Sequence, residues 1–73
     1  MHPNTWKEGY TMESKALQPY KGYTIEKSYE LHAITGKIKK DTIIYTAYTE
    51  DGGIFDGSRT LIELKRKIDE YIK

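Results

Sequence analysis

The chain has 73 residues, no cysteine and only two histidines, and its 12 basic and 11 acidic side chains give a formal charge of +1. A chain of this length forms one domain and buries only about 60% of the surface that its unfolded form would expose. Without cysteine it has no disulfide, and a four-ligand structural zinc is disfavoured. The balanced charge argues against non-specific attraction of the whole chain to nucleic acid or membranes.

The N-terminal segment has the weakest pattern. Residues 1–18 contain Pro3 and Gly9 and show no sustained apolar period, so we expect a partly flexible N-terminal arm there and a small α+β domain over residues 19–73. The motif Gly-Tyr-Thr at Gly9 recurs at Gly22, which is either a coincidence, the interpretation we favour, or a duplicated strand. The alternative role for the arm is to cover the sheet with Trp6 and its neighbours.

The first residues of the sequence are informative about where in the cell the protein is expected. They lack the basic and apolar regions of a secretory signal, and no apolar run approaches the ~20 residues of a membrane span. We therefore expect a cytoplasmic protein without a membrane association.

Two β-strands are predicted in the middle of the chain. The run Tyr23–Tyr29 alternates in polarity, which is typical of a half-buried strand. The segment 29–34 either continues this strand or forms a short helical turn. After a turn at 35–37, the run 38–48 returns as a second, antiparallel strand.

A tight hairpin and a short third strand follow. Asp51-Gly52-Gly53 is a strong hairpin signal, because glycine adopts the positive φ that tight turns demand. The pair Ile54-Phe55 then continues into a short strand. The expected fold class is therefore α+β, with a three-stranded antiparallel sheet, a fourth strand as the open alternative, and one C-terminal helix packed on one face.

The C-terminal helix has the clearest signals. Thr60 and Glu63 have the spacing of a capping box, in which the Thr hydroxyl accepts the N–H near Glu63 and the Glu side chain reaches back to the cap. Ser58 is a competing cap. The apolar residues recur at three- and four-residue spacing, which predicts a stripe that packs on the sheet together with Ile25 and Phe55. The stripe comprises Leu61, Leu64, Ile68, Tyr71 and Ile72.

The second predicted strand is apolar on both sides, although only one helix is present to cover it. Ile43, Tyr45 and Ala47 face one way, and Ile44, Thr46 and Tyr48 face the other. An exposed apolar face usually marks an interface, and tyrosine is an effective interface anchor. We therefore expect a binding surface for a protein partner or a second copy of the chain. Its candidate residues are Ile43, Tyr45, Tyr48, Tyr23 and Tyr29.

The sequence contains no recognisable catalytic, metal or cofactor motif. Neither His2 nor His32 has a nucleophile at a motif distance, and Glu50, Asp51 and Asp56 lack the spacing of a calcium loop. We therefore expect no enzymatic activity, no cofactor, no metal and no small-molecule substrate.

A basic cluster supports a second hypothesis. Lys37, Lys39 and Lys40 lie in the predicted turn region, and Arg59 precedes the helix. If the fold brings these groups to one end of the sheet, they could contact phosphates. The alternative function is therefore nucleic-acid binding, although a charge run in a turn is usually only solvated.

The pattern of strand, hairpin and a final Leu-x-x-Lys-x-x-Ile-Asp helix over residues 20–73 resembles many short uncharacterised proteins of bacteriophages and mobile elements. Some proteins of that kind bind and disable host or defence proteins, so the resemblance implies an accessory protein that modulates such a partner. A second resemblance is to phage-type integrase arm-binding domains, which lay a three-stranded sheet in the major groove. The second predicted strand departs from such readers because it offers Tyr and Thr but no Arg.

Overall fold

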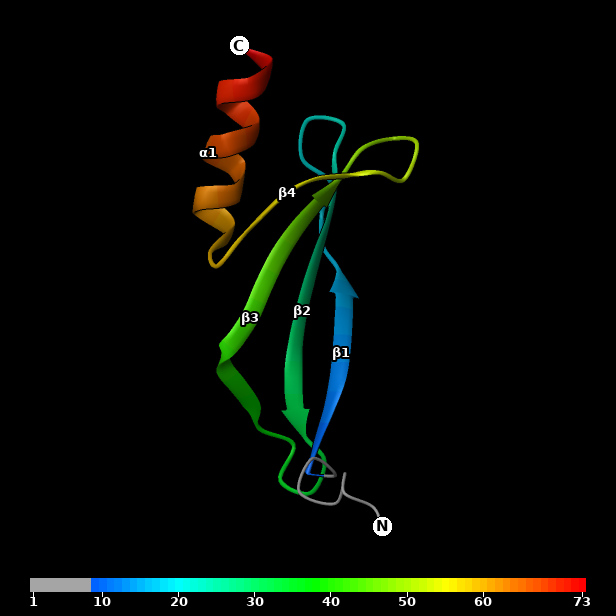
Figure 1. The fold of residues 1–73 in the computed structure, drawn as a ribbon, viewed down its shortest axis with the longest axis vertical. Coiled ribbons are helices and arrows are strands. Elements are labelled where there is room, and N and C mark those ends of the chain that lie inside the picture. The colour runs from blue at the N-terminus through cyan, green and yellow to red at the C-terminus, as the bar shows by residue number, and fades with distance from the viewer. Residues whose placement is uncertain (1–8) are drawn as a thin grey trace.

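In a computed structural model, residues 9–73 form a four-stranded antiparallel sheet with one helix. The strands pair in the order β1-β2-β3-β4, which is also their order along the chain (Figure 1). The α+β class is confirmed, and of the two sheets considered from the sequence the four-stranded one is present. The elements are β1 (Tyr10–Ala16), β2 (Thr24–His32), β3 (Ile38–Tyr48), β4 (Ile54–Ser58) and α1 (Leu61–Ile72).

The first strand lies inside the segment predicted to be an arm. β1 pairs with β2 along its whole length, from Tyr10 opposite His32 to Ala16 opposite Glu26. Each copy of the Gly-Tyr-Thr motif therefore lies at the start of a strand, and β1 is the fourth strand that the sequence left open. Every side chain of β1 is exposed, so the strand is held mainly by its backbone ladder. Residues 1–8, with His2 and Trp6, lie outside the described residues.

The two hairpins form where the sequence predicts them. β2 continues to His32, so the strand and not the helical turn is present, and Gly36 in the following turn has a φ of +74°. In the second hairpin Gly52 has a φ of +90°, a conformation that a side chain would strain. Thr49 closes this loop, because its N–H donates to the Gly53 carbonyl at 2.8 Å.

β3 contains a marked irregularity. The register with β2 changes between Ser28, which lies opposite Ile44, and Glu30, which lies opposite Lys39. Thr42 occupies the irregular segment, where its hydroxyl accepts the Glu30 N–H at 2.8 Å and donates to the Lys39 carbonyl at 2.6 Å. The side chain thus satisfies backbone groups that the interrupted ladder would leave without partners.

The helix begins at the predicted cap. The Thr60 hydroxyl accepts the Glu63 N–H at 3.2 Å. The prediction that the Glu63 side chain reaches back to the cap is wrong, because the Glu63 carboxylate forms an ion pair with Arg66 instead. Arg66 also forms an ion pair with Glu70, one helical turn further on, at 2.6 Å.

The hydrophobic core is small and lies between the helix and one end of the sheet. Leu64 and Ile68 from α1 are buried against Ile25 and Ala47, as the helical stripe predicts. Leu17, Tyr20, Tyr23, Tyr45, Phe55 and Leu61 are partly buried around this centre. The predicted core position of Ile72 is wrong, because its side chain is 44% exposed near the end of the helix.

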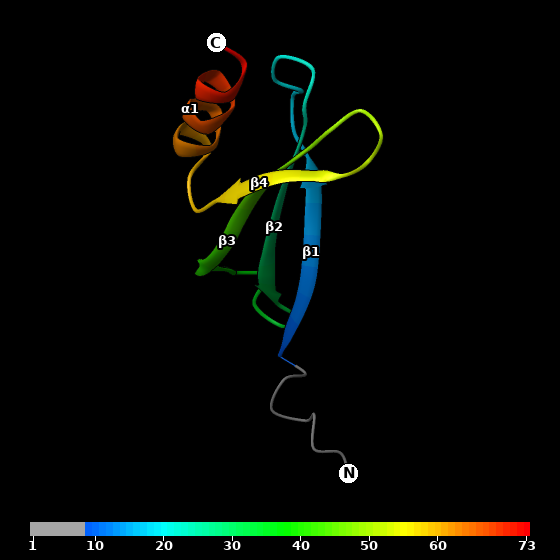
Figure 2. The ribbon, with the colours of Figure 1, turned by 45° about the horizontal axis from the view of Figure 1, so that its top comes forward.

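The sheet has two unlike faces. We call the face that holds Ile25 and Ala47 the helix face, and the face that holds Glu26 and Tyr48 the open face, since residues alternate along each strand. The helix lies beside only one end of the sheet, the end that also carries the β1–β2 and β3–β4 connections (Figures 1 and 2). The other end, toward the β2–β3 turn, extends beyond the helix.

Candidate functional site

The five residues predicted to form one protein-binding face lie on both faces. Lys27 pairs with Tyr45, so Tyr45 and by alternation Ile43 and Tyr29 lie on the helix face. Tyr48 lies on the open face, opposite Thr24. The ring of Tyr23 packs against Phe55 with centroids 4.9 Å apart and belongs to the core margin. The predicted set is therefore not one surface.

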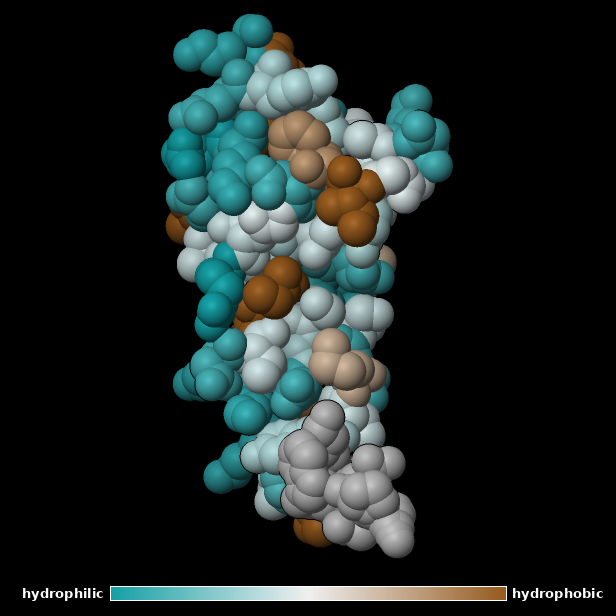
Figure 3. Space-filling view, viewed as in Figure 1, coloured by the Kyte–Doolittle hydropathy of each residue, from teal (hydrophilic) through white to brown (hydrophobic). Residues whose placement is uncertain are grey.

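The open face carries a different set of exposed apolar side chains. Met12 on β1, Ile44 on β3 and Ile54 on β4 are 69%, 36% and 71% exposed, and Tyr10 also lies on this face. The β2 side chains between them are polar, because Thr24, Glu26, Ser28, Glu30 and His32 occupy this face. On the side of the molecule seen in Figure 3, hydrophobic areas are likewise separated by hydrophilic surface.

One hydrogen bond fixes a tyrosine on the open face. The Tyr48 hydroxyl donates to the Glu26 carboxylate at 3.1 Å. This hydrogen bond, with a smaller contribution from desolvation and from the negative charge of Glu26, raises the pKa of Tyr48. The phenol therefore stays protonated, and its hydroxyl is held against a carboxylate.

On the helix face of the sheet, the side chain of Lys27 lies close to two tyrosine rings. The Lys27 ammonium lies 5.7 Å from the Tyr29 ring centroid and 5.9 Å from that of Tyr45. Both distances fit a cation–π contact. The charge of Lys27 on this face of the sheet is therefore stabilised by the two neighbouring tyrosine rings.

The structure brings the predicted basic residues to the part of the sheet near the start of β3. Lys37, Lys39 and Lys40 are exposed there, and the Arg59 guanidinium donates to the Asp41 carbonyl at 2.7 Å. Lys39 lies over the Tyr10 ring at 5.1 Å, on the open face, with Glu30 as its cross-strand neighbour. The cluster is thus accompanied by carboxylates.

His32 has a structural role at the end of β2. Its Nδ1 accepts the N–H groups of Ile34 and Thr35 at 3.3 and 3.2 Å, and its ring meets Tyr10 edge to face. Within residues 9–73, no group of three or more His, Cys, Asp or Glu side chains could hold a metal ion.

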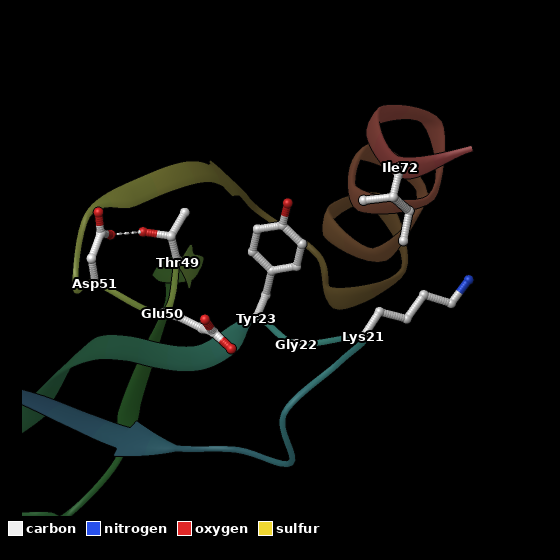
Figure 4. Close-up of a pocket in the computed structure, with 7 residues that line it drawn as sticks. All are labelled: Lys21, Gly22, Tyr23, Thr49, Glu50, Asp51 and Ile72. Carbon is white, nitrogen blue, oxygen red and sulfur yellow. Dashed lines mark hydrogen bonds between the residues drawn. The ribbon is translucent and has the colours of Figure 1, made fainter.

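A groove that the sequence does not indicate lies at the helix end of the sheet. It has a volume of about 550 Å³ and lies between the β1–β2 connection, the β3–β4 hairpin and Ile72. The Tyr23 ring stands between the hairpin residues and Ile72 (Figure 4). The Thr49 hydroxyl donates to Asp51, and this bond and the Gly53 N–H lower the pKa of Asp51. The groove is open and its hairpin wall is acidic, from Glu50 and Asp51.

The two edges of the sheet differ. Leu17 N–H donates to the Ile25 carbonyl and Ala33 N–H to the Gly9 carbonyl, so odd-numbered residues of β1 point their backbone groups at β2. The even-numbered residues therefore point theirs outward, and within residues 9–73 these groups have no hydrogen-bond partner. They belong to Tyr10, Met12, Ser14 and Ala16.

On the opposite edge, the outward backbone groups of Gly57 on β4 are hydrogen-bonded to side chains of the same chain. The outward carbonyl of Gly57 accepts a hydrogen bond from the Lys67 ammonium at 3.0 Å, and its N–H donates to Asp56 at 2.7 Å. Lys67 and Asp56 also form an ion pair at 3.6 Å. The strand is short, and its register with β3 is irregular next to Ala47. A short, irregular strand whose outward groups are partly engaged is a poorer template for another strand than β1 is.

Comparisons of the chain with protein-family models, with curated proteins and with solved structures found no match. Within the described part of the chain, no helix has the length and apolar character needed to cross a membrane.

Proposed function

We propose that this chain is a non-enzymatic binding module that engages a protein partner through the open face of its sheet. The observation that carries the proposal is the position of the helix. α1 packs on the helix face alone, while Met12, Ile44 and Ile54 remain exposed on the open face. The resemblance to phage and mobile-element proteins adds that the partner would be a host or defence protein.

The chemistry of the open face favours a mixed interface. Separate apolar side chains lie among the hydroxyls and carboxylates of β2, and interfaces between proteins combine apolar contacts with about one hydrogen bond per 100–200 Å². Tyr48 is already oriented by Glu26, so its ring needs little ordering when a partner binds. Met12 is unbranched and adapts its shape to a partner surface.

The test compares two substitutions of exposed isoleucines. Ile44→Lys places a charge in the open face, and Ile62→Lys is the matched control because Ile62 is 83% exposed on the helix. We expect a partner captured by the wild-type chain to be lost with Ile44→Lys and retained with Ile62→Lys, and the loss to be reproduced with the purified partner. Circular dichroism shows that both variants are folded. Equal capture by both variants would overturn the proposal.

A second candidate function rests on the position of Arg59. Its bond to the Asp41 carbonyl holds the guanidinium beside β3, so Arg59 shares this part of the surface with Lys37, Lys39 and Lys40, four basic groups in all. Binding of a labelled duplex would have to weaken steeply with salt, with a slope near −0.9 per phosphate contact. Absence of binding at about 50 mM salt would remove this candidate.

A further inference from the structure

We propose that two copies of this chain associate through β1, edge to edge and antiparallel, with Ser14 of one copy opposite Ser14 of the second copy. The pairing joins the two sheets into one. It uses the edge of the sheet and not its open face, so it does not depend on the protein-binding function proposed above.

The backbone of β1 is prepared for such pairing. The outward N–H and C=O groups of Met12, Ser14 and Ala16 alternate along the edge with the spacing of an antiparallel ladder. An exposed row of this kind is a template for another strand. In the proposed register the Ser14 residues exchange hydrogen bonds with each other, and Met12 exchanges them with Ala16 of the second copy.

The charges on β1 favour this register, because it is the one that places Glu13 opposite Lys15. The outward backbone groups of the two copies meet only when even-numbered residues of one β1 strand lie opposite even-numbered residues of the other. The twofold axis that relates the two copies therefore passes through a residue of β1 and not between two residues. An axis at Glu13 would oppose two carboxylates, and an axis at Lys15 would oppose two ammonium groups. With the axis at Ser14, Glu13 lies opposite Lys15 of the second copy, and symmetry repeats this ion pair. Opposite charges at directly paired positions stabilise a sheet, and like charges destabilise it.

Lys15 supplies a second argument. Within one copy it lies opposite Lys27, which is a like-charge pair. Among residues 9–73, neither Lys15 nor Glu13 forms an ion pair. Pairing through β1 places a carboxylate beside Lys15 on the side away from Lys27. On the other face the same register places Met12 against Ala16 of the second copy, an apolar contact.

A single cysteine tests the register directly, because the chain has no cysteine of its own. In the proposed pairing the two Ser14 Cα atoms lie about 5.5 Å apart, within the range of a disulfide. The two Met12 Cα atoms are offset by four residues, or about 13 Å, which a disulfide cannot span. Under mild oxidation of the full chain, we expect Ser14→Cys to form a disulfide-linked dimer rapidly and Met12→Cys to remain monomeric.

A charge exchange tests the ion pairs. Glu13→Lys and Lys15→Glu each create like-charge contacts that symmetry repeats, so each should weaken the dimer about tenfold or more in sedimentation equilibrium. The double variant Glu13→Lys/Lys15→Glu restores opposite charges and should restore dimerisation. Lys15→Glu also removes the contact with Lys27, so its monomer should fold at least as well as the wild type, which a thermal melt checks.

Three results would overturn the proposal. The first is a wild-type chain that sediments as a monomer up to about 1 mM. The second is a dimer that both single charge variants leave unchanged. The third is equal cross-linking of Ser14→Cys and Met12→Cys, which would mean random collision.

Discussion

The Tyr20 hydroxyl donates a hydrogen bond to the Asp69 carboxylate at 2.9 Å and so joins the β1–β2 connection to the end of α1. The Lys21 ammonium reaches the same carboxylate at 2.7 Å. Lys21 has a φ of +49°, a conformation that non-glycine residues rarely adopt. Asp69 thus ties two consecutive residues of the β1–β2 connection to the helix.

The Asp69 contacts predict a dependence of stability on pH. The Lys21 ammonium and the Tyr20 hydroxyl lower the pKa of Asp69, and Asp69 raises the pKa of Lys21. The carboxylate's stabilisation is complete above its unfolded pKa of about 3.9 and is lost as the pH falls through the lower folded value. The ammonium's contribution is present below about pH 10.4 and is lost as the pH rises through its folded pKa.

Asp69→Asn should therefore lower the thermal midpoint at pH 7, and the difference from the wild type should shrink below about pH 4. Thermal melts across this range measure it. Glu70→Gln is a control on the same helix, since Glu70 pairs with Arg66 and not with the connection. A difference that stays constant down to pH 2 would contradict the pairing.

The packing of the core predicts that truncating one isoleucine of α1 lowers the folding stability strongly, whereas truncating another changes it little. Ile68 is fully buried against the sheet, so Ile68→Ala should cost about 2–5 kcal/mol of folding free energy, which in so small a domain approaches its whole stability. Ile62→Ala removes a side chain that is 83% exposed and should change stability by less than about 0.5 kcal/mol. Urea denaturation of both variants is the measurement. Similar midpoints for the two would show that α1 does not pack as described.

The second hairpin predicts strain at Gly52. A Cβ built there meets no atom within 4 Å, so any cost of Gly52→Ala comes from the φ of +90° and not from a clash. We expect a loss of about 1 kcal/mol, and a smaller loss for Gly52→Asn because asparagine tolerates positive φ better. Chemical denaturation of the two variants, compared with the wild type, separates the cases. A larger loss for Asn than for Ala would contradict this reasoning.

The hydrogen bond between Tyr48 and Glu26 on the open face predicts that the pKa of Tyr48 depends on Glu26. Glu26→Ala removes the acceptor of the Tyr48 hydroxyl, so the pKa of Tyr48 should fall toward its ordinary value of about 10. Glu30→Ala removes another carboxylate of the same face that does not contact Tyr48. NMR of ¹³C-labelled tyrosine resolves the titration of this residue. An identical Tyr48 titration in both variants would show that the hydrogen bond does not form in solution.

Much of the fold is predictable because its signals are local. The Thr60 cap, the apolar spacing of Leu64 and Ile68 and the turn glycines of both hairpins depend on residues a few positions apart. The strand boundaries 38–48 follow from the same local pattern. Asp69 shows the limit of such reasoning, because helical spacing favours Lys65 and Lys73 as its partners, whereas the structure pairs it with Lys21.

The features that the sequence does not predict have physical reasons. β1 has exposed side chains on both faces, so it lacks the alternation that reveals a half-buried strand. The candidate interface residues share a composition but not a face, because alternation along β3 puts Tyr45 and Tyr48 on opposite sides of the sheet. The edge of β1 depends on backbone groups, which every residue carries, so only the pairing of the strands shows that this edge is open.

The bond from Lys67 to Gly57 has a consequence for how far association can extend. A sheet with two open edges can add copies at both sides without limit and grow into a filament. In this chain Lys67 and Asp56 engage the outward backbone groups of Gly57 on β4, so a pair joined through β1 would offer only a short and partly engaged strand at each outer side. Lys67 thereby favours a finite assembly over growth into a filament.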